Sequence, residues 1–195
     1  MPEDVVLATA RLMSAEVGLV PVSPGAGAAL RLLAAAGNAR AVVEIGTGTG
    51  VSSLWLLAGM RPDGVLTTID AEGEHQRLAR RLFIEAGYLA SRARIITGRA
   101  LDVLPRLADG GYDMVFADAD SREYTAFVTE AHRLLRPGGV LVLNGAWAGG
   151  RIGDPAARDP QTVGVREVIK VLRDAEEWTP ALLGTGDGLL CAVRR

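Results

Sequence analysis

The chain has 195 residues, of which 49% are hydrophobic and 23% are charged, so its length fits one globular domain over residues 1–195. Its 21 Lys and Arg residues are outnumbered by 23 Asp and Glu residues, which argues against nucleic acid or an anionic membrane as a partner. Residues 1–4 are acidic, unlike a secretory signal, and no uncharged apolar run approaches the ~18 residues of a membrane span. We therefore expect a cytoplasmic protein without a membrane segment.

Two helices are expected within residues 1–37, before any strand. Pro2 can open the first helix. The apolar face of this helix consists of Val5, Ala8, Leu12 and Ala15. Ser23 followed by Pro24 is typical of an N-cap and a first-turn proline, so a second helix should begin there and end at Gly37.

The middle of the chain alternates apolar runs with segments of helical periodicity. The runs lie at residues 41–45, 65–69, 93–97, 114–117 and 140–143. This alternation indicates a parallel sheet covered by helices on both faces. Two last runs, 179–183 and 189–193, are joined by only five residues, which suits a hairpin. We predict an α/β fold with a doubly wound, seven-stranded Rossmann-like sheet that ends in an antiparallel hairpin.

One long irregular stretch interrupts this pattern at residues 145–160. It is rich in Gly, Ala, Pro and Asp. Loops of this length are often functional lids, so the stretch is a candidate active-site loop.

Glycines are concentrated where the first strand ends, in the glycine loop of residues 46–50. Without Cβ atoms, glycines let a ligand approach backbone N–H groups at a helix N-terminus. Asp70 ends the next strand, where a carboxylate in such a fold can accept hydrogen bonds from ribose hydroxyls. These features predict an adenosine-containing cofactor; a tight turn with Asp70 as a helix cap is the plain structural alternative.

The glycine spacing argues against a dinucleotide. A G-x-G-x-x-G pattern would need its third glycine at Val51 or Ser53. Glu44, just before the loop, would repel a phosphate but can pair with an amino group, and no Lys or Arg lies between residues 41 and 60. The pattern favours a cofactor that carries a cationic amino acid.

Together these motifs resemble class I S-adenosylmethionine-dependent methyltransferases, whose fold is a seven-stranded doubly wound sheet with a last antiparallel strand. More narrowly, the chain is similar to O-methyltransferases related to the catechol and caffeoyl-coenzyme A enzymes. The similarity is carried by residues 22–27, 44–46, 118–120, 154–155 and 186–188. The resemblance also implies a homodimer.

This resemblance implies a set of cofactor-binding residues. Asp70 would contact the ribose and Ala100 the adenine, while Asp118 and Asp120 would lie at the methyl-transfer end. The methionine part would lie among Val22, Glu44, Gly46, Thr47, Gly48 and Ser52.

In that family a divalent cation such as Mg²⁺ is held by Asp, Asp and Asn, and a lysine follows the first Asp as a base. Asp118 and Asn144 match the first and last ligands. Leu143 occupies the middle position, however, and Ser121 stands where the lysine would be. Two possibilities stay open: Mg²⁺ bound weakly through Asp118 and Asn144, or metal-free transfer in which Asp118 or Asp120 accepts the proton.

The resulting hypothesis is an O-methyltransferase that moves a methyl group from S-adenosylmethionine to a hydroxyl of a small aromatic molecule. Asp118, Asn144 and Trp147 are the candidate substrate-binding residues, although Trp147 can equally be a packing anchor. One alternative is a cofactor-binding protein that has lost catalysis, which Leu143 and Ser121 suggest. Another is an NAD-type oxidoreductase, which the glycine spacing disfavours.

Overall fold

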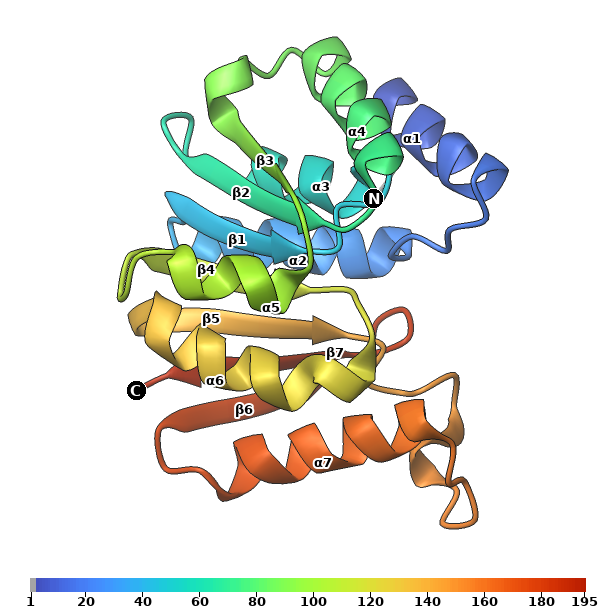
Figure 1. Cartoon of the computed structure of the whole chain (residues 1–195), viewed down its shortest axis with the longest axis vertical. Coiled ribbons are helices and arrows are strands. Elements are labelled where there is room, and N and C mark those ends of the chain that lie inside the picture. Colours follow the sequence, from blue (N-terminus) through green and yellow to red (C-terminus); the bar gives the residue numbers. More distant parts are fainter. Residues whose placement is uncertain (1–2) are drawn as a thin grey trace.

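The computed structural model of the protein describes residues 3–195, so the predicted helix start at Pro2 lies outside the described residues. The described chain forms a seven-stranded sheet in the order β3-β2-β1-β4-β5-β7-β6 (Figure 1). Its strands are β1 (Ala41–Ile45), β2 (Val65–Asp70), β3 (Ala93–Thr97), β4 (Tyr112–Ala117), β5 (Leu135–Asn144), β6 (Trp178–Leu183) and β7 (Leu189–Arg194). Strands β1 to β5 are parallel, and β7 runs antiparallel to both β5 and β6. The predicted fold class and terminal hairpin are confirmed.

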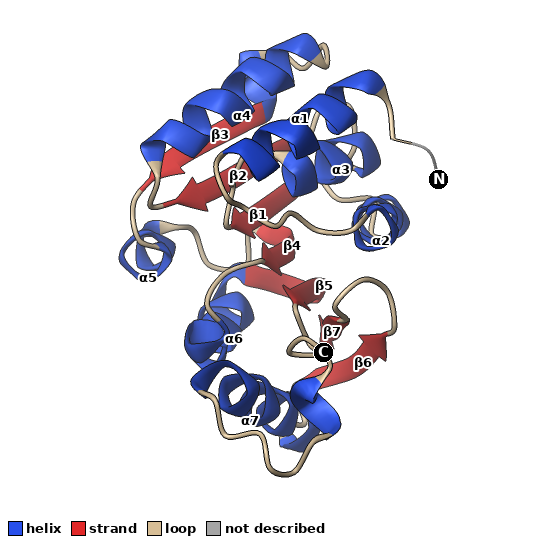
Figure 2. Ribbon diagram, turned by 90° about the vertical axis from the view of Figure 1, so that its right-hand side faces the viewer, coloured by secondary structure: helices blue, strands red, loops and turns tan. Residues whose placement is uncertain are grey.

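Helices cover both faces of this sheet (Figure 2). One face carries α1 (Val5–Glu16), α2 (Pro24–Ala36), α3 (Val51–Gly59) and α4 (Gly73–Glu85). The other carries α5 (Ala100–Val103), α6 (Tyr124–Leu134) and α7 (Pro160–Asp174). Short 3₁₀ turns lie at Ala90–Arg92, Leu104–Arg106, Ser121–Glu123 and Arg151–Gly153.

The strands are apolar on both sides because each face of the sheet is buried under helices. Successive side chains of a strand point to opposite faces. Val42 of β1 therefore packs with α1 to α4, whereas Val43 packs with α5 to α7. On β5, Val142 belongs to the first core, while Leu141 and Leu143 belong to the second. Two separate cores hold the sheet in register.

The apolar face predicted for α1 has the expected helical spacing but is exposed to solvent. Val5 and Leu12 are 79% and 69% exposed. The opposite face, with Leu7, Ala10 and Ser14, is buried against the rest of the protein. Ala10 and Ser14 on this face are small and lie against Thr49, which follows β1.

The end of the sheet that positions the functional residues is the carboxyl edge of its parallel strands. Strands β1 and β4 are neighbours but are followed by helices on opposite faces, which makes this a switch point of the kind where α/β proteins bind ligands. Gly46 follows β1 and Asp118 follows β4. The backbone of Gly46 lies so close to the Asp118 carbonyl that a Cβ would collide with it.

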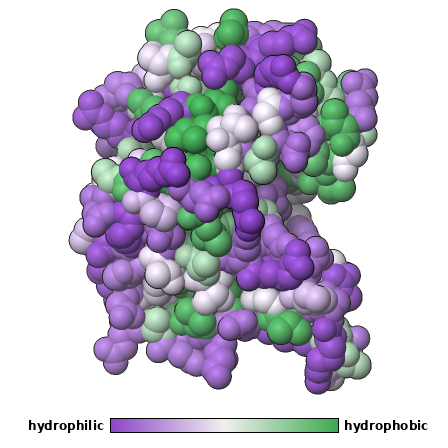
Figure 3. Space-filling model, in the orientation of Figure 1, coloured by the Kyte–Doolittle hydropathy of each residue, from purple (hydrophilic) through white to green (hydrophobic). Residues whose placement is uncertain are grey.

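Hydrophilic residues cover most of the face formed by α5 to α7, with hydrophobic residues interspersed (Figure 3). Among the residues that the structure describes, no helix is both long and apolar enough to cross a membrane.

Candidate active site

Three cavities open at this edge of the sheet, and Asp118 lines all of them. The glycine-loop cavity, of about 150 Å³, lies between the glycine loop and the segment that joins α1 to α2. The β2 cavity, of about 330 Å³, lies beyond the ends of β2 and β3. The α7 cavity, of about 570 Å³, lies between the ends of β4 and β5, the loop after β5 and the first turns of α7. A ligand and a second molecule can thus meet beside Asp118.

The glycine loop adopts a backbone that glycine alone accepts at little cost. Gly46, Gly48 and Gly50 have φ angles of +93°, +48° and +91°. Asp70 braces the loop, because its Oδ2 accepts from the Gly48 N–H at 2.8 Å while its Oδ1 accepts from the Glu72 N–H at 2.9 Å. The glycine-loop cavity is lined by seven of the predicted cofactor-binding residues, namely Val22, Gly46, Thr47, Gly48, Ser52, Asp70 and Asp118.

Glu44 lies behind this cavity and does not line it. Its side chain is fully buried, and it accepts hydrogen bonds from Ser52 Oγ at 2.6 Å, from Thr68 Oγ1 at 2.6 Å and from Ser53 Oγ. Burial raises the pKa of Glu44 to about 7, against the opposing effect of the three hydroxyl donors. Of the groups that hold Glu44, Ser52 is the one that also faces the cavity, so Glu44 can influence a ligand through Ser52.

Helix α1 contributes a residue that the sequence did not single out. Ser14 lines the glycine-loop cavity and is 1% exposed. Its Oγ lies 2.5 Å from Thr49 Oγ1, which itself lies 2.9 Å from the Ala10 carbonyl. These hydroxyls fasten α1 to the glycine loop. Ser14 and Thr49 are 35 positions apart, so no local pattern reveals the contact.

The β2 cavity contains Asp70 and Ala100, the residues expected to face a ribose and an adenine. Ala100 is the first residue of α5. Arg99 and Glu123 also line this cavity and form an ion pair at 3.4 Å. This pair was not predicted, because its members are 24 positions apart along the chain.

The α7 cavity contains Asp118 in a fixed hydrogen-bonded arrangement. Tyr124 donates its hydroxyl to the Asn144 carbonyl at 2.7 Å, and Asn144 Nδ2 donates to Asp118 Oδ1 at 2.9 Å. Burial raises the pKa of Asp118, and the nearby Asp187 carboxylate adds to the rise, while the Asn144 hydrogen bond opposes it. Burial also raises the pKa of Tyr124, so its hydroxyl stays a donor at neutral pH. Tyr124, at the start of α6, thus holds the backbone of Asn144 at the end of β5, and Asn144 orients the Asp118 carboxylate.

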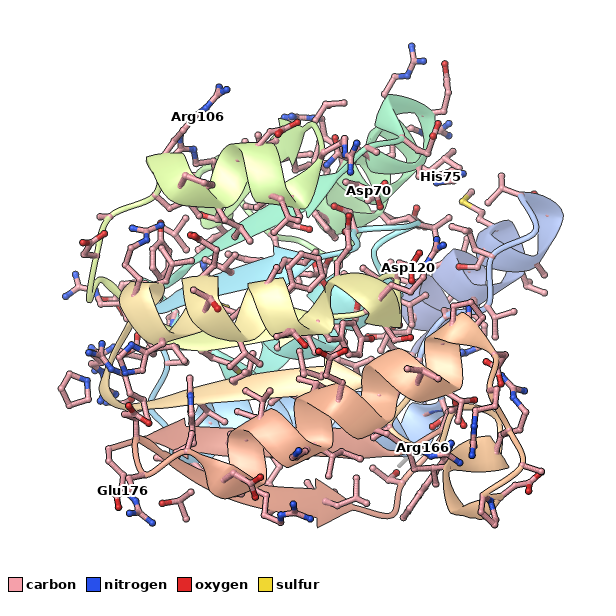
Figure 4. All side chains as sticks on the ribbon, turned by 60° about the horizontal axis from the view of Figure 1, so that its bottom comes forward. Asp70, His75, Arg106, Asp120, Arg166 and Glu176 are labelled. Carbon is pink, nitrogen blue, oxygen red and sulfur yellow. The ribbon has the colours of Figure 1, made fainter. Side chains whose placement is uncertain are left out.

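Of the two carboxylates that were predicted to be catalytic, Asp118 lines the cavities and Asp120 does not. Asp120 is absent from the residues that line the three cavities. It forms an ion pair with Arg122, whose Nε lies 2.8 Å from Asp120 Oδ2, and this pairing lowers the pKa of Asp120. In Figure 4, Asp70 and Asp120 lie at the same end of the molecule. Asp120 therefore caps the 3₁₀ turn Ser121–Glu123 beside the site, and its negative charge is paired with Arg122.

Trp147 is placed as a packing residue. It does not line the α7 cavity, although Ala148 and Gly149 do. Its ring lies over the turn between β6 and β7, where a Cβ on Gly188 would come 2.9 Å from Trp147 Cδ1. Its backbone N–H donates to the Asp187 carbonyl at 2.8 Å. The ring therefore fixes the turn that carries Asp187.

Asp187 is a lining residue of the α7 cavity that the sequence interpretation did not include. Its Oδ1 accepts from the Gly149 N–H at 3.1 Å. The signal was the motif at residues 186–188, in which glycines flank a carboxylate at a hairpin turn. Only the fold shows that this turn reaches the edge where β4 and β5 end.

The predicted active-site loop forms one wall of the α7 cavity, through Gly145, Ala148, Gly149 and Arg151. Arg166 of α7, labelled in Figure 4, fastens this loop. Its guanidinium donates to the carbonyls of Ala157 at 2.7 Å and Ile152 at 3.2 Å. Arg151 is paired with Asp159 at 3.2 Å. The loop is therefore tied to α7 on the outer side of the cavity.

The residues present do not fit the three-ligand cation site that the family resemblance implies. Leu143 is fully buried in the apolar core beneath α6 and α7, where no carboxylate replaces it. Ser121 Oγ donates to the Gln161 carbonyl at 3.0 Å. Within residues 3–195, no three His, Cys, Asp or Glu side chains are grouped to hold a metal ion. Asp118 and Asn144 remain as a pair that is already hydrogen-bonded.

Comparison with known proteins identifies the family. Residues 3–195 match the sequence profile of a family described as O-methyltransferase. The chain belongs to this O-methyltransferase family. It is 55% identical to a Mycobacterium tuberculosis protein named as an O-methyltransferase, over 98% of this chain and 86% of that protein.

Two solved structures are similar to this O-methyltransferase over almost its whole length. One is a Corynebacterium glutamicum protein, with 36% identity and a TM-score of 0.93, which covers 100% of this chain and 91% of its own. The other is the O-methyltransferase TomG of Streptomyces achromogenes, involved in tomaymycin synthesis and crystallised with S-adenosylmethionine. It has 35% identity and a TM-score of 0.90, and it covers 99% of this chain and 91% of its own.

Proposed function

We propose that this O-methyltransferase transfers the methyl group of S-adenosylmethionine to a hydroxyl of a small aromatic molecule. The observation that carries the proposal is that the three cavities meet at Asp118. Two of them suit the parts of the cofactor, and the third suits an acceptor. The membership of the O-methyltransferase family and the complex of TomG with S-adenosylmethionine support this assignment.

In this proposal the cofactor spans the glycine-loop and β2 cavities. The methionine part lies among Val22, Gly46 to Gly48 and Ser52, and Glu44 acts from behind through Ser52. The adenine lies beside Ala100. The ribose hydroxyls donate to Asp70, whose carboxylate accepts one backbone N–H on each oxygen and keeps further lone pairs for a ligand.

The acceptor lies in the α7 cavity with its hydroxyl beside Asp118. The acceptor oxygen would form a bond to the methyl carbon while the bond from that carbon to sulfur breaks. The hydroxyl proton would leave to the solvent, and S-adenosylhomocysteine would be the second product. Asp118, held by Asn144, lies beside the acceptor oxygen and orients it. Asp120 has no part in this step, because its carboxylate forms an ion pair with Arg122. The proposal includes no protein-held cation, because Asp118 and Asn144 do not form the three-ligand site.

A binding experiment tests the cofactor assignment. S-adenosylhomocysteine at ~100 times its dissociation constant should stabilise the protein by ~2.7 kcal/mol, which raises the melting temperature by several degrees. NAD at the same concentration should cause no shift, since the glycine spacing does not suit a pyrophosphate. A shift with NAD alone would support the oxidoreductase alternative and contradict the proposal.

Turnover separates an active enzyme from a protein that only binds the cofactor. S-adenosylhomocysteine released from S-adenosylmethionine in the presence of a panel of hydroxylated aromatics should be detectable by mass spectrometry. An Asp118→Asn variant that still binds the cofactor is the matched control. Binding without any release across the panel would support the non-catalytic alternative.

We also propose a cytoplasmic homodimer. The exposed apolar face of α1, with Val5 79% and Leu12 69% exposed, supports a contact with a second copy of the chain. Sedimentation should show a dimer that Leu12→Lys weakens. A monomer at all concentrations would contradict this part of the proposal alone.

A further inference from the structure

We infer that the acceptor is a hydroxyl compound of unusual acidity, such as a phenol conjugated to a nitro or carbonyl group or an enol, which is ionised in neutral solution by its own chemistry. This inference rests on the proposed methyl transfer. It follows from what the α7 cavity holds and from what it lacks.

The cavity lacks a strong base and a cation beside the reacting oxygen. Its lining contains neither a lysine nor a histidine. The single lysine of the chain, Lys170, is exposed on α7, and His132 lies against Trp178 near the opposite end of the sheet. Ser121 faces the cavity, but its hydroxyl donates a hydrogen bond to the Gln161 carbonyl.

The titratable and charged groups that face the cavity are few. They are Asp118, Tyr124, Arg151 and Asp187. Tyr124 is a buried donor, and a carboxylate is a weak base toward an ordinary phenol, because the ordinary pKa values of the two groups differ by about 6. An ordinary phenol would therefore enter the site protonated and stay so. An acidic hydroxyl has already given its proton to the solvent.

Two positive groups can stabilise an anionic oxygen in the site. They are the sulfonium that the cofactor would bring and the guanidinium of Arg151, while the carboxylates of Asp118 and Asp187 oppose them. The Nε–H of Arg151 donates to Asp159 Oδ2 at 3.2 Å and to Thr162 Oγ1, whereas its Nη1 donates no hydrogen bond within the described residues. Transfer then joins an anionic oxygen to the methyl carbon of a cationic sulfonium, and both charges disappear. No proton has to move within the site during this step.

Two phenols of similar shape test the inference, 4-nitrophenol and 4-methylphenol. The first is the stronger acid by about three pKa units, so at pH 7.5 its ionised fraction is larger by about 200-fold. The weaker nucleophilicity of the more stable anion offsets part of this gain. We expect kcat/KM for 4-nitrophenol to exceed that for 4-methylphenol by about tenfold, without a loss when EDTA is added.

The pH profile gives a second, independent readout. For 4-methylphenol, kcat/KM should rise about tenfold for each pH unit between pH 6.5 and 8.5, since it follows the ionised fraction. For 4-nitrophenol it should level off above about pH 7.5. Equal kcat/KM for the two phenols, a flat profile for 4-methylphenol, or a requirement for Mg²⁺ would each overturn the inference.

Binding of the coloured 4-nitrophenolate ion to the complex with sinefungin, a cofactor analogue in which a protonated amine replaces the sulfonium methyl group, tests the same point without turnover. Visible absorbance should show that the complex binds the anion in preference to the neutral phenol, and Arg151→Gln should weaken this binding several-fold. Arg158→Gln is the matched control, because Arg158 lies on the same loop, is exposed and donates only to loop carbonyls. Arg151→Lys should keep most of the binding.

The binding outcomes separate the two proposals. Preference for the neutral phenol, or no binding of either form, would overturn the acceptor class while the cofactor assignment stands. Failure of S-adenosylhomocysteine itself to bind would overturn the proposed function.

Discussion

Glu44→Gln is a sharp test of how the buried carboxyl behind the glycine loop contributes to stability. Glu44 is fully buried and accepts hydrogen bonds from three hydroxyls, of Ser52, Ser53 and Thr68. Glutamine has nearly the same shape but carries no charge at any pH. The substitution therefore removes the ionisation of this side chain and keeps most of the packing.

The sign of the effect follows from the raised pKa of Glu44. Below pH 4.5 the side chain is protonated in both the folded and the unfolded chain. Between pH 4.5 and about 7 the folded state keeps the proton that the unfolded state loses, so the free energy of unfolding falls as the pH rises. A pKa of about 7 in place of 4.5 corresponds to about 3 kcal/mol, of which about three-quarters is lost between pH 5 and 8.

Urea denaturation of the cofactor-free protein at pH 5, 6, 7 and 8 measures this difference. At pH 5 the variant should be less stable than the parent by about 1 kcal/mol, because the glutamine amide faces a hydroxyl donor. At pH 8 the variant should be the more stable protein by about 2 kcal/mol. A stability difference that stays constant from pH 5 to 8 would refute the raised pKa of Glu44.

Three further substitutions test the roles of neighbouring residues. Gly46→Ala should lower the free energy of unfolding by several kcal/mol, because its Cβ would strike a backbone carbonyl, and calorimetry should show no binding of S-adenosylhomocysteine. Gly87 also has a positive φ but lies in open space, so Gly87→Ala should lower the free energy of unfolding by only about 1 kcal/mol. Asp118→Asn should lower methyl transfer by at least about 100-fold, while Asp120→Asn, which breaks an exposed ion pair, should change it by less than about threefold. Trp147→Ala should lower the unfolding free energy by about 2 kcal/mol in urea and raise the acceptor KM without changing cofactor affinity; an unchanged KM would contradict its role.

The strands could be predicted because each is a short apolar run between turn residues, and a sheet buried on both faces requires such runs. The exposed face of α1 could not be predicted from periodicity. Periodicity identifies which residues share a face, but Val5 and Leu12 give no sign of which face meets the protein. The inner face could be recognised only through the contact of Ser14 with Thr49, which depends on how the chain folds back.

The candidate cofactor residues were easier to predict than the acceptor residues. Gly46, Gly48 and Asp70 follow two adjacent strands, so a local pattern of glycine and carboxylate describes their geometry. The role of Asp187 depends on the hairpin reaching the edge of the sheet where Gly149 meets it. No spacing along the chain encodes that approach.

One residue near the acceptor cavity, Leu143, is nevertheless informative in the sequence itself. Side chains of β5 alternate between the two cores, and Leu143 points into the core beneath α6 and α7 with no exposure. A carboxylate at this position would need a cation or a hydrogen-bond donor to offset its burial. Leucine instead fills the apolar core below the Asp118–Asn144 pair. The negative charge of the acceptor oxygen therefore has to be stabilised by the cofactor, by Arg151 or by the electronic structure of an acidic acceptor.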